Sequence, residues 1–239
     1  MATEFDPVRP SSSLARAAGF FYLLTILTGI LAQFMAGQLV ISDNAESTAA
    51  NILSNENSFR IGFLADAVMT ACYVVVTALF YRLFRSTNRV ISLVAAFFSL
   101  VGCAMMAVSL LSYLAPLVVL KSSIGSFNTE QLEVLSLLIL RVFRRSYDVG
   151  LIFFGAYCIL IGFLAVKCDF IPRVIGFLMV FAGLGWLTYL WPPLAGYLEP
   201  YNLLPGLVGE GALALWLLVK GTGRTANNSF KPNPLRGSA

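Results

Sequence analysis

The sequence contains no histidine, and only 12% of its residues are charged. Histidine is the commonest metal ligand and the usual general base near neutral pH, so its absence removes the most frequent kinds of metal and acid–base site. Soluble domains carry roughly 25% charged residues. A soluble protein with 58% hydrophobic residues would expose large apolar patches. The shortage of charge therefore indicates a protein whose surface faces lipid.

Several enzyme motifs are also missing. The chain has no GxSxG motif of serine hydrolases, no HExxH motif of zinc proteases, no DxxxD-type phosphate–magnesium pair and no Walker loop. Its four cysteines form no CxxC pair and no zinc spacing. We interpret them as small apolar fillers and expect no disulfide. Neither a metal nor a cofactor is predicted, and no enzyme class is indicated.

Six apolar segments are long enough to cross a membrane, for which a helix needs about 20 mostly apolar residues. The third is longer than a span requires, and Pro116 is expected to bend or end it. The fifth closes at the prolines of "WPP". The sequence therefore predicts an all-α polytopic transmembrane helical bundle. We place its spans near Ala17–Ile41, Phe59–Phe84, Val90–Leu120, Ser146–Val166, Arg173–Leu194 and Leu203–Lys220.

The segments outside the spans differ in character. In "NTEQLEVLSLL", Thr129 can cap a helix whose first turns carry Glu130 and Glu133. This predicts a short outer-surface helix before span four. Both ends of the chain are polar and rich in Pro, Gly and Ser, which is typical of disorder. We therefore divide the chain into a disordered N-terminus (1–16), a six-helix domain (17–220) and a disordered C-terminal tail (221–239).

The basic residues indicate an orientation. With the N-terminus inside, eleven of the sixteen Lys and Arg residues fall on the cytoplasmic side. Cytoplasmic loops carry an excess of these residues, so both termini are predicted to be cytoplasmic. The net charge of +4 does not indicate nucleic acid, because the basic residues are scattered between spans. The predicted partner is the lipid bilayer, and the oligomeric state is not indicated.

Three acidic residues, Asp66, Asp148 and Glu210, fall inside apolar segments. A charged side chain near the centre of a spanning helix costs at least ~2.5–3.5 kcal/mol. Counting from the predicted ends of the spans, Asp66 and Glu210 both lie roughly 10 Å below the outer edge. Asp148 is slightly shallower, and Gln33 lies at a similar depth. Asp66 also begins a polar stripe with Thr70, Tyr73 and Thr77 on one helical face.

Arginines accompany these acids. Arg144 and Arg145 precede Asp148 by four and three residues, a spacing at which helical side chains meet. Arg60 stands at the outer end of span two. We therefore predict one polar site in the outer half of the membrane, able to bind a ligand. Its predicted members are Gln33, Arg60, Asp66, Arg144, Arg145, Asp148 and Glu210.

Five stretches together resemble a known family: "ARAAGFFYLLTILTGILAQF", "FRIGFLADAVM", "SYDVGLIFFGAYCILIGFL", "IPRVIGFLMVFAGLGWL" and "GEGALALWLLVKG". The chain resembles the domain-of-unknown-function family 4386, bacterial multi-pass membrane proteins, from about Ala15 to Gly221. The resemblance implies location and topology only. The family's "LHxxGYD" has a His where this chain has Phe143, and its first span commonly has Glu where Gln33 stands.

Three functions fit these observations. The chain could bind or transport a small anionic molecule or a lipid, since arginines suit phosphate and carboxylate groups. It could be a structural or partner-binding subunit in which Arg–carboxylate pairs clasp helices together. It could also be an intramembrane enzyme, because clustered carboxylates raise one another's pKa and so supply an acid. The sequence leaves these alternatives open.

Overall fold

The computed structural model describes residues 11–41, 43–122 and 127–222, and this part of the chain contains helices and turns but no strand. Six of its helical segments are long and apolar enough to cross a membrane. They are α1 (Ser12–Gly37), α3 (Glu56–Phe84), α4 (Arg89–Tyr113) with α5 (Ala115–Leu120), α6 (Thr129–Lys167), α7 (Arg173–Leu187) with the 3-10 turn η1 (Thr188–Leu190), and α9 (Leu203–Lys220). The predicted all-α, six-span membrane protein is confirmed.

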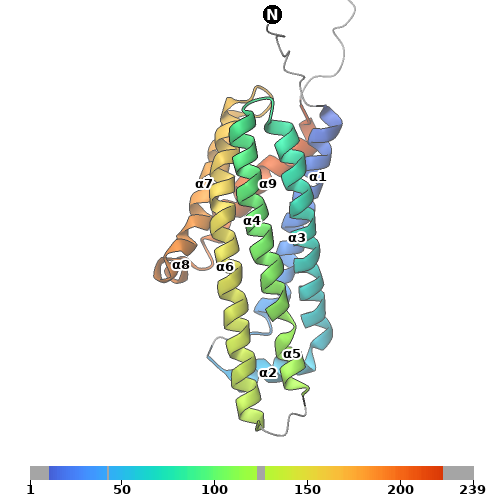
Figure 1. The fold of residues 1–239 in the computed structure, drawn as a ribbon, viewed down its shortest axis with the longest axis vertical. Helices are drawn as coiled ribbons and strands as arrows, with labels where there is room; N and C mark the ends of the chain where they lie inside the picture. The colour runs from blue at the N-terminus through green and yellow to red at the C-terminus, as the bar shows by residue number, and fades with distance from the viewer. Residues whose placement is uncertain (1–10, 42, 123–126, 223–239) are drawn as a thin grey trace, which may run out of the picture.

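The spanning helices form a ring in chain order. Each of α1, α3, α4, α6, α7 and α9 packs on the next, and α1 closes the ring against α9 (Figure 1). The closure also brings together Ser12 and Thr222, whose hydroxyl oxygens lie 2.8 Å apart. Aromatic side chains fill the interior, where Tyr73 of α3 packs against Phe154 and Tyr157 of α6. The ring is therefore a packed bundle whose first and last helices are neighbours.

The backbones of α6 and α7 pack directly against each other. A Cβ added at Gly162 would lie 2.6 Å from the carbonyl oxygen of Gly176, and one added at Gly183 would lie 2.6 Å from that of Gly155. Small residues let membrane helices approach closely, which increases their van der Waals contact. Glycine is thus required at both levels of this interface.

The end of the bundle opposite the N-terminus, here called the α2–α5 end, carries a second, smaller core. α2 (Ala45–Ser54) and α5 lie against the first part of α6 at this end (Figure 1). At 1.5 Å per residue, the 39 residues of α6 span about 58 Å, whereas the hydrocarbon layer is about 30 Å thick. α6 is therefore long enough to project well beyond the membrane. The second core consists of Leu39, Ile52, Phe59, Tyr113, Leu117 and Leu140.

The predicted surface helix and span four are parts of one helix, because α6 runs from Thr129 to Lys167 without a break. Its N-cap is Asn128 rather than Thr129. The Asn128 side chain accepts a hydrogen bond from the backbone N–H of Gln131, whose side chain accepts one from that of Asn128. An Asn oxygen serves this role as well as a hydroxyl does, so the capping residue is one position earlier than predicted.

Other bounds agree closely with the sequence. α9 begins and ends at the predicted residues, and the third segment breaks after Tyr113, next to the expected Pro116. α1 begins at Ser12, so residues 12–16 are helical where disorder was predicted. The rest of the predicted N-terminal disorder (1–10) and nearly all of the predicted tail (223–239) lie outside the described residues.

Candidate functional site

Glu210 of α9 lies in the middle of the ring, surrounded by hydrogen-bond donors that carry no charge. The Tyr22 hydroxyl donates to Glu210 Oε2 at 2.8 Å, and the Trp186 indole N–H donates to Oε1 at 2.7 Å. Tyr73 and Cys158 make longer contacts, of 3.4 and 3.8 Å. Since these donors come from α1, α7, α3 and α6, the carboxylate joins five of the six ring helices.

Glycines place Glu210 within reach of these partners. On the same helix, Gly209 packs against the backbone of Leu178 of α7, where an added Cβ would lie 2.3 Å from the carbonyl oxygen. Gly206, one turn before Glu210, lies under the Trp186 ring, where an added Cβ would lie 2.2 Å from Cζ2. Because both positions lack a side chain, α9 approaches α7 and the indole N–H reaches Glu210.

Glu210 and Asp66 do not lie at the common level that was predicted for them. Glu210 lies ten residues before Lys220, or about 15 Å along α9, which is half the thickness of the hydrocarbon layer. Its partner Tyr73 lies seven residues beyond Asp66 on α3, about 10 Å further along that helix. Glu210 and Asp66 are therefore at different levels. The sequence estimate treated both helices as starting at one edge, whereas α3 extends into the α2–α5 end.

Glu210 also lines a cavity of about 460 Å³ between α1 and α9, here called the lateral cavity. α1 and α9 touch backbone to backbone near Gly19, where an added Cβ would lie 2.5 Å from the Leu218 nitrogen. Further along, residues of both helices line the cavity instead, and Phe34 and Leu207 are at once cavity-lining and surface-exposed. The cavity therefore opens sideways on the surface of the bundle. Its polar and aromatic lining residues are Thr25, Gln33, Phe34, Tyr73, Tyr147, Phe154, Trp186 and Glu210.

Asp148 belongs to a second pocket, of about 400 Å³, which α6 shares with Asp43 and with residues between Tyr189 and Glu199. Its carboxylate forms ion pairs with Arg144 and Arg145, each at 3.4 Å, so the predicted pairing is confirmed. Arg144 also pairs with Glu199, which follows α8 (Pro192–Leu198), at 2.8 Å. Arg141, on the same face of α6, pairs with Asp43 at 3.2 Å. Guanidinium and carboxylate groups are thus balanced three to three among the residues that line this pocket.

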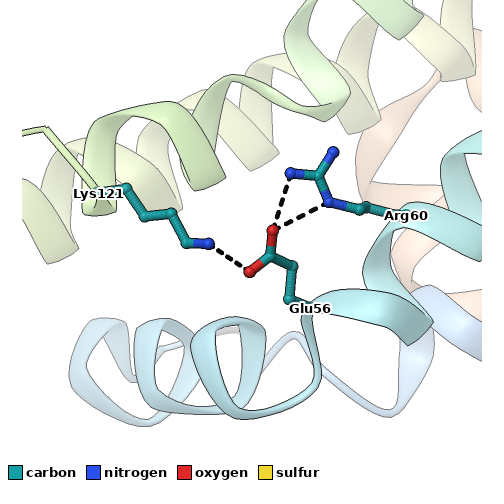
Figure 2. A network of polar contacts seen from close by, with 3 residues as sticks. All are labelled: Glu56, Arg60 and Lys121. Carbon is teal, nitrogen blue, oxygen red and sulfur yellow. Dashed lines mark hydrogen bonds and ion pairs between the residues drawn. The ribbon is translucent and has the colours of Figure 1, made fainter.

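Arg60 belongs to neither pocket. It pairs with Glu56, one turn earlier on α3, at 2.8 Å. Glu56 also binds Lys121, which follows α5, so one carboxylate bridges α3 to the end of the third span (Figure 2). The prediction that Arg60 joins the other arginines is wrong. An acidic residue four positions away on the same helix is the nearer partner.

Asp66 is buried, with 6% of its surface exposed, but it lines neither pocket. No ion pair or side-chain hydrogen bond joins its carboxylate to another described residue. The Tyr113 hydroxyl lies against Gly62, one helical turn from Asp66, where an added Cβ would lie 2.3 Å from it. Asp66 therefore faces the interior, as predicted, close to aromatic side chains.

The seven predicted site residues thus occupy four places rather than one. Gln33 and Glu210 share the lateral cavity, Arg144, Arg145 and Asp148 share the second pocket, and Asp66 and Arg60 each stand apart. Among the described residues, no three His, Cys, Asp or Glu side chains come close enough to hold a metal ion. Phe143, where the family resemblance has His, packs against Tyr113 and Tyr147.

Sequence reasoning missed Tyr22, Cys158 and Trp186 as partners of Glu210, and it assigned Tyr73 only to a packing stripe. The available signal was weak: each is a single donor within a long apolar run. Buried Tyr and Trp side chains usually find an acceptor, and Glu210 is the acceptor here. Cys168, just after α6, does not bind Glu210: its thiol donates to the Ala165 carbonyl oxygen at 3.3 Å, and burial raises its pKa.

Comparison with known proteins supports the resemblance found in the sequence. Residues 17–221 match the family model described as "Domain of unknown function (DUF4386)". An uncharacterized protein of Archaeoglobus fulgidus is 33% identical over 82 residues, which is 34% of this chain. The match spans half the length of that relative. No solved structure matches the chain.

Proposed function

The chain belongs to the DUF4386 family and is a multi-pass membrane protein, and from this premise we propose that it binds a lipid-like amphiphile inside the membrane. The binding site is the cavity lined by α1, α9 and Glu210. An amphiphile enters it sideways from the bilayer, places its apolar part between α1 and α9, and directs its polar group toward Glu210.

One observation carries this proposal. α1 and α9 touch near Gly19, but further along α1, from Thr25 to Phe34, the lateral cavity separates the two helices. Ligand cavities are typically 300–1,000 Å³ and mostly apolar, with a few polar groups that fix orientation. The lateral cavity has this volume, this composition and one carboxylate at mid-depth. A bundle that only needed to be stable would gain from packing this space with side chains.

The other functions receive less support from the geometry. An anionic ligand in the second pocket would meet Asp43, Asp148 and Glu199 beside the arginines, so its charge has no net attraction there. The clasp alternative accounts for the ion pairs that join different segments, Arg144–Glu199, Arg141–Asp43 and Lys121–Glu56, but it does not account for the open cavity beside Glu210. The enzyme alternative requires clustered carboxylates, whereas Glu210 and Asp66 stand at different depths.

Filling the cavity tests the proposal. A Cβ added at Gly29, which lines the cavity, would lie 3.0 Å from the flexible Met69 sulfur, whereas a Cβ added at Gly211 would meet nothing within 4 Å. We expect the purified wild type and Gly211→Leu to retain bilayer lipid in native mass spectrometry. Gly29→Leu should retain at least tenfold less. Equal lipid retention by all three proteins would contradict the proposal.

We also propose that both termini are cytoplasmic, in the inner membrane. The eleven-to-five division of Lys and Arg supports this orientation. This orientation would place the α2–α5 end of the bundle, with its ion pairs, on the outer side of the membrane. Reporter fusions after Lys220 and within residues 43–57 should be active on opposite sides. A C-terminal fusion that is active in the periplasm would reverse the orientation.

A further inference from the structure

We propose that the lateral cavity selects amphiphiles with a cationic amine head group, whose charge pairs with Glu210. This inference rests on the proposed function and names its ligand class. The sequence by itself favoured an anionic ligand, because arginines were expected beside Glu210. The structure separates Glu210 from every arginine that was grouped with it.

Charge is the first argument. Glu210 receives hydrogen bonds from a tyrosine hydroxyl, an indole N–H and weaker donors, but none of these groups is charged. Among the described residues, no lysine or arginine lines the cavity. A buried carboxylate without a counter-charge is costly even when it is hydrogen-bonded. A ligand that brings a positive charge removes this cost, whereas an anionic ligand would increase it.

The shape and chemistry of the walls are the second argument. The aromatic side chains of Tyr73, Tyr147, Phe154 and Trp186 line the space beside Glu210. Aromatic faces attract alkylammonium groups, most strongly where water is excluded. The lining also includes the surface-exposed apolar side chains of Ile30, Phe34 and Leu207. The cavity thus offers aromatic faces to a cation and apolar side chains to a hydrocarbon chain.

The position of Glu210 is the third argument. It lies about 10 Å from the Leu203 end of its helix and about 15 Å from the Lys220 end, and most of the residues that line its cavity are apolar. A ligand that carries its own hydrocarbon chain partitions into the bilayer and arrives from the side. This favours an amphiphilic amine over a free metal or inorganic cation.

Three probes of equal length test the charge preference in the intact protein: hexylamine, hexanol and hexanoate. Thermal unfolding is measured in an uncharged detergent at neutral pH, where hexylamine is a cation. A ligand that binds only the folded state raises Tm according to its concentration and affinity. We expect hexylamine to bind wild type at least tenfold more tightly than hexanol, and hexanoate to bind most weakly. This comparison needs no variant.

The variant Glu210→Gln should reduce hexylamine affinity at least tenfold, to that of hexanol, and leave hexanol affinity unchanged. Glu199→Gln removes an exposed acid outside the cavity and should behave like wild type. Equal binding of all three probes to wild type would overturn the charge preference and leave the proposed function standing. Probes that bind neither wild type nor Glu199→Gln, together with equal lipid retention by Gly29→Leu, would overturn both.

Discussion

Two acids in this molecule are almost equally buried, with 7% of Asp148 and 6% of Glu210 exposed, yet they are stabilised in opposite ways. Asp148 lies 19 residues from Lys167, about 28 Å along α6, and so close to one edge of the membrane. Its partners are arginines of its own helix. Glu210 lies at mid-depth, and its partners are neutral groups of four other helices.

The difference follows from the surroundings. Near the edge of the membrane, long arginine side chains hold their charge partly in water while they pair with an acid. At mid-depth a guanidinium would have to be desolvated as well, so neutral donors satisfy the carboxylate at lower cost. The ion pairs of Asp148 therefore lie within one helix, whereas the hydrogen bonds of Glu210 join five of the six ring helices.

The largest expected effect is the loss of the Glu210 carboxylate. Glu210→Ala leaves the Tyr22 hydroxyl and the Trp186 N–H buried without their acceptor, and each such group costs about 1–3 kcal/mol. We expect the free energy of unfolding, measured by reversible unfolding in detergent, to fall by about 3 kcal/mol. Asp148→Ala should cost about 1 kcal/mol, because Arg144 keeps Glu199 and Arg145 is mostly exposed. An equal loss of stability in both variants would contradict the proposed difference between the two acids.

The second effect disturbs Glu210 without changing it or its partners. Gly206→Ala would place a methyl group 2.2 Å from the Trp186 ring, so the indole must move away from Glu210. We expect a loss of about 2 kcal/mol, of the size that overpacking causes, with a change in tryptophan fluorescence. The matched change Gly211→Ala meets nothing within 4 Å and should stabilise the helix by about 0.5 kcal/mol. Loss of stability in both variants would indicate a general intolerance of α9.

A third prediction ranks the donors. Tyr22→Phe removes the 2.8 Å hydrogen bond to Glu210 and should cost about 1.5 kcal/mol. Tyr73→Phe removes the 3.4 Å contact and should cost about 0.5 kcal/mol, since longer hydrogen bonds are weaker. Unfolding of the two single variants and of the double variant would show this order. The reverse order would mean that Tyr73 is the principal donor.

The smallest expected effect is a difference in how salt changes the destabilisation that results from neutralising each acid. Surface ion pairs are screened because the Debye length falls to about 3 Å at 1 M salt. The destabilisation by Asp148→Asn, about 0.5–1 kcal/mol at low salt, should shrink at 1 M sodium chloride. The destabilisation by Glu210→Gln should not change, because its partners are neutral and buried. Parallel salt dependence would place Glu210 in contact with water.

The sequence could predict those features that depend on one segment at a time. The bounds of α9 follow from its apolar length and final lysine, and the Asp148 pairs follow from i, i+3 and i, i+4 spacing. The partners of Glu210 could not be predicted in this way. Tyr22 lies 188 residues away, and the depth at which each helix enters the ring is decided by packing between helices.

The second core shows the same limit. Neither α2 nor the junction of Lys121 with Glu56 was predicted, because each element is short and its partners are distant in sequence. The error over Arg60 came from the same cause: its nearest acid was visible in the sequence, but the relative heights of the helices were not. Helix existence was thus readable from composition, whereas helix heights required the structure.

The closure of the ring has a consequence for the order in which this protein is made. Chains emerge from the ribosome with the N-terminal part first, so Tyr22, Tyr73, Cys158 and Trp186 are all synthesised before Glu210. Until α9 is inserted, these donors have no carboxylate to bind, and α1 has no partner on its open side. A nascent chain that stops before residue 203 therefore lacks both the acid and one wall of the cavity. Insertion of the last helix is the step that completes the ring and the cavity.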